Sequence, residues 1–153
     1  MRLPKPFEYY LKGGIVKKIS PDKSRANFLI DESILSLQGL KERIEKIGVN
    51  ERNSNSIIKD CYDILTELIR AKMLIEGYSA SGIFSHEAEI SYMFNLSFSE
   101  NDIKFMNDLR YFRNGIMYYG KRLDKQYTKK VLNFLDKTYP KLKQLLKPIT
   151  PNP

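Results

Sequence analysis

The chain has 153 residues, the length of one ordinary domain, and its 42% of hydrophobic residues can form a sizeable core. The chain has a single cysteine, Cys61, and a single histidine, His86, which excludes an internal disulfide and a Cys/His zinc site. It has no long apolar run and no recognisable signal peptide, so we expect a soluble, cytoplasmic protein. Lys and Arg outnumber Asp and Glu by 26 to 18, and the net charge of +8 suits a phosphate-bearing partner as well as plain solubility. We expect no cofactor and no metal.

The N-terminal part of the chain predicts an arm followed by a long helix. Residues 1–20 mix prolines and glycines with short apolar clusters, so we expect an arm with one helical turn that packs on the main body. Ser20–Pro21–Asp22 then offers a hydroxyl N-cap, a proline suited to a first helical turn and an acidic residue that favours the positive helix end. Apolar residues recur at three- and four-residue steps from Ala26 to Ile47, which predicts a helix that ends at Gly48.

The middle of the chain predicts two more helices. After a polar break at 50–55, an apolar stripe from Ile57 to Leu74 predicts a second helix that ends at Gly77. We expect residues 77–82 to be a flexible connection. Ser85, followed by Glu87 and Ala88, then caps a shorter third helix that reaches about Leu96.

The C-terminal part predicts a fourth and a fifth helix. Ser99 caps the fourth, which runs to Gly120, a residue type common at helix ends. The fifth carries apolar residues from Val131 to Leu146, and Pro140 should kink or break it. No segment alternates with the period of a strand over more than a few residues. We therefore expect an all-α fold, an antiparallel bundle of about five helices over residues 21–147, with a loose tail at 148–153.

The fourth helix has two distinct faces on a helical wheel. One is an apolar stripe of the kind that packs in a core: Phe105, Leu109, Phe112, Ile116, Tyr119 and Leu123. The other combines apolar and polar residues: Ile103, Met106, Arg110, Arg113, Asn114, Met117 and Lys121, with Tyr118 at its edge. A solvated face would not need Ile103, Met106 and Met117. We expect this face to contact another helix of the chain or a second subunit, and we favour a homodimer interface.

Arg110 and Arg113 lie three residues apart on that second face. A guanidinium stays charged at any working pH, and its planar fork matches a phosphate. Across a two-fold axis both copies of Arg113 would share one cleft, where a phosphodiester could bind. The alternative, which the residue types leave open, is that the two arginines pair with surface acids such as Asp108 or Glu100.

The run LRYFRNGIMYYG at residues 109–120 resembles the signature helix of the HEPN superfamily, in which an arginine, often followed by a polar residue, precedes a histidine by about four to six positions. Arg113 and Asn114 match the first half of that motif. Residues 12–22 and 85–88 are similar to small archaeal members of the superfamily. The resemblance implies a helical homodimer with the signature helices near its axis and, in active members, a metal-independent endoribonuclease or toxin.

Tyr118 stands where the superfamily's histidine would fall. RNA cleavage without a metal uses the ribose 2′-hydroxyl as nucleophile, so it needs a base, an acid and a cation for the charge on phosphorus. Histidine can accept or donate a proton near neutrality, whereas tyrosine, with a pKa of about 10, can only donate one. We expect weak or absent cleavage, with Arg113 and Tyr118 as the catalytic candidates. Together with Arg110, Asn114 and Lys121 they are also the candidates for phosphate binding.

The remaining polar residues carry weaker signals. His86 could fill the vacant catalytic role, but a partly exposed histidine at a helix start is commonplace. Cys61 lies in an apolar stripe and should be buried. The acidic residues of the second helix, namely Asp60, Asp63, Glu67 and Glu76, are interpreted as parts of solvated faces.

Taken together, these patterns predict a homodimer that binds RNA or a nucleotide phosphate and is weakly active or inactive as a nuclease. Two alternatives stay open. The protein could be an active metal-independent endoribonuclease that acts as a toxin or in RNA processing. It could instead be a protein-interaction module that partners a nucleotidyltransferase.

Overall fold

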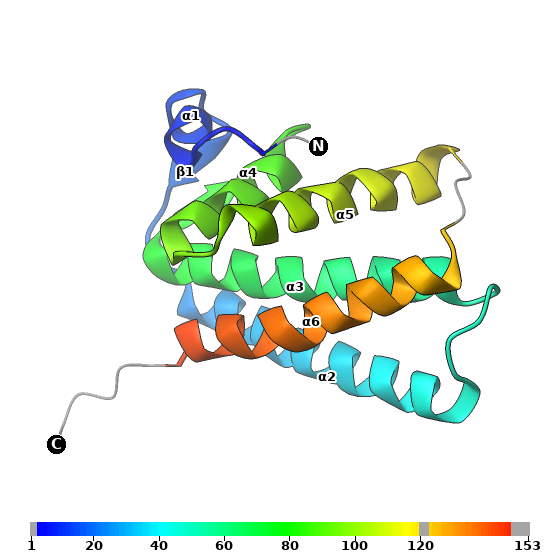
Figure 1. Ribbon diagram of the computed structural model, residues 1–153. Helices are drawn as coiled ribbons and strands as arrows, with labels where there is room; N and C mark the ends of the chain where they lie inside the picture. Colours follow the sequence, from blue (N-terminus) through cyan, green and yellow to red (C-terminus); the bar gives the residue numbers. More distant parts are fainter. Residues whose placement is uncertain (1–2, 120–122, 148–153) are drawn as a thin grey trace, which may run out of the picture.

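The computed structural model describes the backbone of residues 3–119 and 123–147 and the side chains of residues 3–115 and 123–147 (Figure 1). The described residues confirm the all-α class, with a two-stranded sheet as the only addition. The elements follow in the order α1 (Phe7–Lys12), β1 (Val16–Lys18), α2 (Lys23–Ile47), α3 (Ser54–Glu76), β2 (Tyr78–Ala80), α4 (Ser85–Ser91), the 3-10 helix η1 (Tyr92–Leu96), α5 (Glu100–Tyr119) and α6 (Lys125–Leu145). No helix in this part of the chain is long and apolar enough to cross a membrane.

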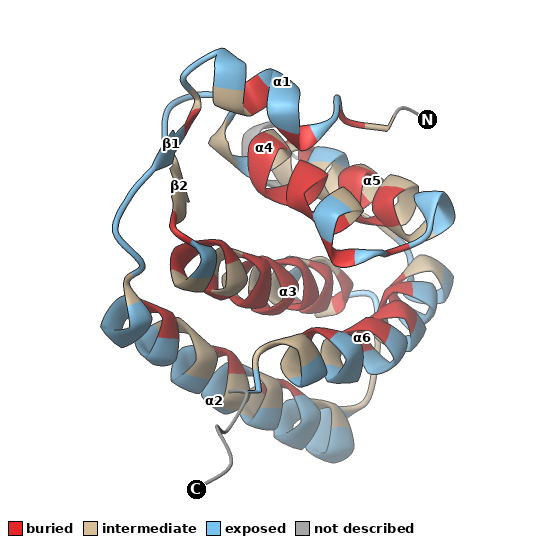
Figure 2. Ribbon diagram, turned by 90° about the vertical axis from the view of Figure 1, so that its left-hand side faces the viewer, coloured by how far each residue is buried: buried red, intermediate tan, exposed pale blue. Residues whose placement is uncertain are grey.

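Helix α3 forms the centre of the bundle. Helices α2, α4, α5 and α6 all contact it, and Figure 2 shows it buried along most of its length. Cys61 is buried among its apolar residues, as the sequence predicts. The core side chains of α3 are Ile57, Ile58, Cys61, Ile64, Leu65, Leu68, Ile69, Met73 and Leu74. These helices cover the apolar side chains of α3, while the acidic side chains of Asp63 and Glu76 remain 44% and 41% exposed.

The predicted ends of the two long helices are confirmed, and one cap differs. Helix α2 ends at Gly48 and α3 at Gly77, which adopts the left-handed conformation that glycine tolerates best. The N-cap of α2 is Asp22 rather than Ser20, because its side chain accepts a hydrogen bond from the backbone N–H of Arg25. The acidic residue therefore caps the helix directly and does more than favour its positive end.

The segment expected to be a flexible connection at 77–82 contains a strand. Strand β2 pairs antiparallel with β1, and Val16 lies opposite Ala80. The N-terminal arm packs beside this sheet, where the ring of Phe7 contacts that of Tyr78 edge-on. Strands of three residues are too short to show an alternating pattern, so the sequence carries no signal for them.

Two helices differ from their predicted form. The third is α-helical only to Ser91 and continues as η1 to Leu96. Of the predicted kink or break at Pro140, the break is wrong, since α6 runs through this residue to Leu145. Proline has no backbone N–H, so the carbonyl of Asp136 loses its helical hydrogen-bond donor. Both residues are exposed, so water can donate to this carbonyl instead.

The expectation that Ile103 and Met106 form a dimer interface is wrong. Both side chains are 0% exposed and belong to the core of a single chain. Helix α5 is covered from two directions, because it contacts α3 on one side and α4 and η1 on another. Phe105 and Phe112, on the stripe predicted to be the core face, are only half-buried and contact the ring of Tyr127 on α6. Both faces of α5 therefore serve packing within the chain.

Candidate functional site

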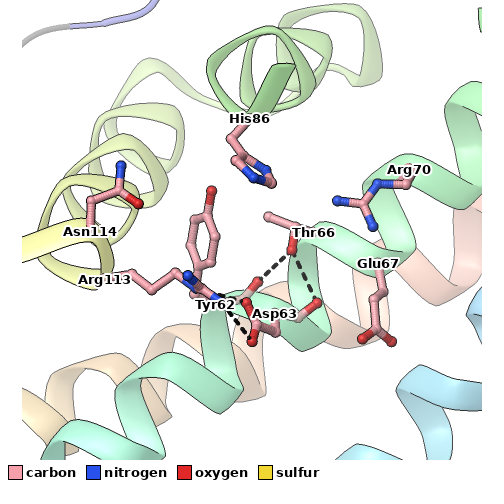
Figure 3. Close-up of a pocket in the computed structure, with 8 residues that line it drawn as sticks. All are labelled: Tyr62, Asp63, Thr66, Glu67, Arg70, His86, Arg113 and Asn114. Atoms are coloured by element: carbon pink, nitrogen blue, oxygen red, sulfur yellow. Dashed lines mark hydrogen bonds and ion pairs between the residues drawn. The ribbon is translucent and has the colours of Figure 1, made fainter. Parts of the chain in front are cut away.

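A pocket of about 240 Å³ opens between α3, α4 and α5 (Figure 3). Its volume is below the roughly 300–1,000 Å³ of typical small-molecule sites, so it suits one compact polar group better than a whole cofactor. Arg113 and Asn114, both predicted from the sequence, lie on its α5 wall. The other lining residues are Tyr62, Asp63, Thr66, Glu67, Arg70 and His86.

Helix α3 supplies the floor of this pocket through residue spacing. Tyr62, Thr66 and Arg70 follow one another at four-residue steps, which places them along one stripe of the helix. The Thr66 hydroxyl donates to the backbone carbonyl of Tyr62 at 3.0 Å, so its oxygen still has capacity to accept. This stripe of α3 therefore presents polar side chains to the pocket.

Arg113 reaches from α5 to α3 and pairs with Asp63. Its Nε donates to Oδ1 at 3.0 Å and its Nη2 to Oδ2 at 3.4 Å. The guanidinium also lies 5.9 Å from the centre of the Tyr62 ring. Asp63 thus has a partner across the pocket, and its side chain, which is 44% exposed, still faces solvent as the sequence predicts. The sequence left open that the arginines pair with acidic residues, and Arg113 does so, but its partner is Asp63, fifty positions away, rather than Asp108 or Glu100.

Arg110 does not join Arg113 in the pocket lining. Its Nε donates to the side-chain oxygen of Asn107 at 3.0 Å, one turn back along α5. Its positive charge still acts on the hydroxyl of Tyr62. The predicted pair of phosphate-binding arginines is therefore split, and the pocket's second arginine is Arg70 from α3.

The hydroxyl of Tyr62 is a buried polar atom that lacks a hydrogen-bond partner in the described part of the chain. The residue is 2% exposed, and its hydroxyl has no hydrogen-bond partner among the described residues. Figure 3 shows it directed into the space between Asn114 and His86. Burial, assisted by the negative charge of Glu89, raises the pKa of this phenol, so it remains a donor throughout the physiological range. An unsatisfied buried hydroxyl costs about 1–3 kcal/mol, which an acceptor on a ligand would recover.

Glu89 contacts two side chains of the pocket, Arg70 and His86. Its carboxylate is 4% exposed, and it accepts from Nε of Arg70 at 2.6 Å and from Nη2 at 3.1 Å. It also lies 3.3 Å from Nδ1 of His86. Burial acts to raise the pKa of Glu89, but the hydrogen bonds from His86 and Arg70 outweigh burial and hold the pKa below its usual value. Glu89 is therefore a buried carboxylate that anchors both neighbours.

His86 is half-exposed at the start of α4, as the sequence suggests, but it lines the same pocket as Arg113. Sequence reasoning undervalued it because α4 and α5 are brought together only by tertiary packing. A signal was present in the spacing of His86 and Glu89, three residues apart on one helix face.

Glu67 departs in part from the expected solvated face of α3, because its side chain is half-buried. Its Oε2 is buried without a hydrogen-bond partner, and burial together with the charge of Asp63 raises its pKa. In Figure 3 its carboxyl group points away from Tyr62 and His86. The remaining predicted site residues, Met117, Tyr118 and Lys121, lie outside the described side chains.

The pocket presents several donors and no set of metal ligands. The side chains described contain no group of three or more His, Cys, Asp or Glu residues that could hold a metal ion. The Tyr62 hydroxyl, the Asn114 amide and the two guanidinium groups suit a compact ligand rich in acceptor oxygens. No protein-family model, no curated protein and no solved structure matches this chain.

Proposed function

We propose that the protein binds RNA or a nucleotide through a phosphate group in the pocket between α3, α4 and α5. The observation that carries this proposal is that Arg70 and Arg113 line one pocket, beside the Tyr62 hydroxyl, a buried donor without a partner among the described residues. The two guanidinium groups could donate to phosphate oxygens. The resemblance to HEPN proteins agrees with this choice, because Arg113 and Asn114 carry it.

The ion pairs of the two arginines are compatible with a bound phosphate. Asp63 and Glu89 each use two of the five N–H donors of their arginine and hold it from one side. The described residues supply no further acceptor to either guanidinium. The carboxylates therefore fix the two forks in place, and a phosphate would contact the donors that remain.

The proposed pocket belongs to one chain, so it needs no second subunit to be complete. We keep a homodimer as part of the proposal, with an interface other than Ile103 and Met106. Sedimentation of the full chain at micromolar concentration tests it, and a monomer there would refute this part alone. The phosphate-binding part would be unaffected.

RNA binding by Arg113→Ala tests the proposal. Fluorescence anisotropy with a labelled single-stranded RNA should show a loss of affinity of roughly tenfold or more, since a hydrogen bond to a charged group contributes about 1.5–3 kcal/mol. The matched control is Arg43→Ala, which removes the same charge from an arginine paired with Asp60 at 2.6 Å outside the pocket. Affinity should fall with rising salt in the wild type, and less steeply in Arg113→Ala.

Two outcomes would contradict the proposal. Equal losses in both variants would mean that the net charge, and not the pocket, attracts RNA. No binding by the wild type at low salt would remove the function altogether and favour the alternative of a partner-binding module, for which a nucleotidyltransferase is the candidate partner.

A second candidate function, metal-independent cleavage of RNA, is favoured by one observation. His86 lines the pocket together with Arg113, so it could supply the imidazole that the signature motif lacks at position 118. Wild-type protein in EDTA should then release products with cyclic 2′,3′-phosphate ends, and His86→Gln should slow this by about 10²–10⁴. Intact RNA after prolonged incubation would leave binding as the function.

A further inference from the structure

We propose that His86 contacts the bound phosphate as an imidazolium, that Glu89 is the positioning residue that holds it there, and that the pocket takes up a proton when it binds RNA. This inference rests on the proposed phosphate binding. It adds a contact residue that the signature motif does not contain, and a pH dependence that follows from it.

The first argument is the charge balance of the pocket. Helix α5 contributes the cation Arg113, and α3 contributes the cation Arg70. Three carboxylates oppose them, two from α3 and one from α4, namely Asp63, Glu67 and Glu89. With a neutral imidazole these groups carry one excess negative charge, and a phosphodiester would add a further negative charge. Protonation of His86 supplies the missing cation where the ligand would lie.

Other charged groups near α4 and α5 do not replace this cation. Glu87, next to His86 in the sequence, acts on the hydroxyl of Tyr10 in α1 and adds negative charge. Arg110 bonds to Asn107 and lies outside the pocket lining, although its charge reaches Tyr62. The one group of the pocket that ordinarily gains a positive charge between pH 8 and pH 5 is therefore the histidine.

The second argument is the orientation of the imidazole. Nδ1 lies 3.3 Å from Oε1 of Glu89, which leaves Nε2 for the ligand. Figure 3 shows the ring above Thr66, between Tyr62 and Arg70. Glu89 is almost fully buried and also bound twice by Arg70, so a shift of its carboxylate would leave a guanidinium unpaired. The anchor of the histidine is thus fixed by a second strong interaction.

The size of the effect follows from linkage between proton and ligand. An opposite charge a few ångströms away changes the proton affinity of a group by a factor of about 10 to 1,000. Because linkage is reciprocal, the protonated pocket should bind the phosphate more tightly by the same factor. Affinity should therefore increase as the pH falls through the range in which histidine gains its proton.

The test compares RNA affinity at about pH 5.5 and about pH 8, at constant ionic strength. The probe is a labelled oligouridine of about six nucleotides, because its phosphodiesters keep one negative charge each across this range. Wild-type protein should bind at least about tenfold more tightly at the lower pH. His86→Gln should bind equally at both. Glu67→Gln, which removes a pocket carboxyl whose pKa is raised by burial, should keep the wild-type dependence.

The outcomes separate this inference from the proposed function. Binding that depends on Arg113 but not on pH would refute the role of His86 and leave the phosphate site in place. A pH dependence that persists in His86→Gln and disappears in Glu67→Gln would assign the proton to Glu67 and also refute the inference. No RNA binding at either pH would refute the proposed function, and this inference with it.

The positioning role of Glu89 has its own readout. In Glu89→Gln the preference of RNA binding for the lower pH should shrink toward that of His86→Gln, because the carboxylate that orients the imidazole is gone. A purely structural role would lower affinity equally at both pH values, which would refute the positioning role. Dispersed amide signals in an NMR spectrum confirm that the variant is folded.

Discussion

The substitutions Ile103→Ala and Met106→Ala should each destabilise a single chain, whatever its concentration. Both side chains are 0% exposed within one chain, although the sequence pattern places them on the predicted dimer face. Each change removes the equivalent of about three CH₂ groups, at about 0.8 kcal/mol each in transfer free energy. Incomplete collapse of the surrounding core adds to this, so the free energy of unfolding should fall by about 3 kcal/mol.

Urea denaturation followed by circular dichroism measures this loss. For a domain of this length, 3 kcal/mol corresponds to a decrease in Tm of roughly 6–12 °C. The control is Leu35→Ala on α2, where the side chain is 62% exposed and the loss should stay below about 0.5 kcal/mol. Each variant is measured at two protein concentrations about fiftyfold apart, because a dimer interface would make stability depend on concentration.

Two results would refute the reasoning. A loss below about 1 kcal/mol in either variant would mean that the side chain is not in a packed core. A loss that disappears at the higher protein concentration would restore the interface on this face of α5, because association would then supply the missing stability.

Three further predictions concern single positions. Gly77→Ala should lower the free energy of unfolding by more than about 1 kcal/mol, since φ is +86° and a Cβ would lie 2.8 Å from the carbonyl oxygen of Ile19. The control Gly39→Ala, inside α2, should raise it by about 0.5–1 kcal/mol, and equal stabilities of the two variants in urea denaturation would contradict this. Burial raises the pKa of Cys61 to about 12, so a thiol reagent should react only as fast as the chain unfolds, and rapid labelling of the native protein would refute its burial. Glu67→Gln should raise Tm at pH 7 and lose that gain below about pH 4, because a carboxyl group whose pKa is raised in the folded state destabilises the fold only where it is ionised. A gain in Tm that is largest in acid would contradict this direction of the pKa shift.

The helices could be predicted from the sequence because their signals are local. Apolar residues at three- and four-residue steps define α2 and α3, and the glycines at 48 and 77 end them. Where the signal was short or ambiguous, prediction failed. The strands are too brief to alternate, and Pro140 is tolerated because it lies on the exposed side of α6.

The candidate site was predicted only in part. Arg113 and Asn114 stand out in the sequence, but Tyr62, Arg70 and His86 do not, because each is an ordinary residue in its own helix. Their importance arises from proximity: the pocket combines three helices, and the ion pair of Arg113 spans fifty positions.

The two faces of α5 show the general limit. A hydrophobic pattern establishes which side of a helix avoids water, so the sequence by itself determined that Ile103 and Met106 would be covered. It does not contain the identity of the covering element, since α4, η1 or a second subunit could each provide an apolar surface. The tertiary structure decided that question, because packing depends on how all the helices share one core, and no single helix encodes that arrangement.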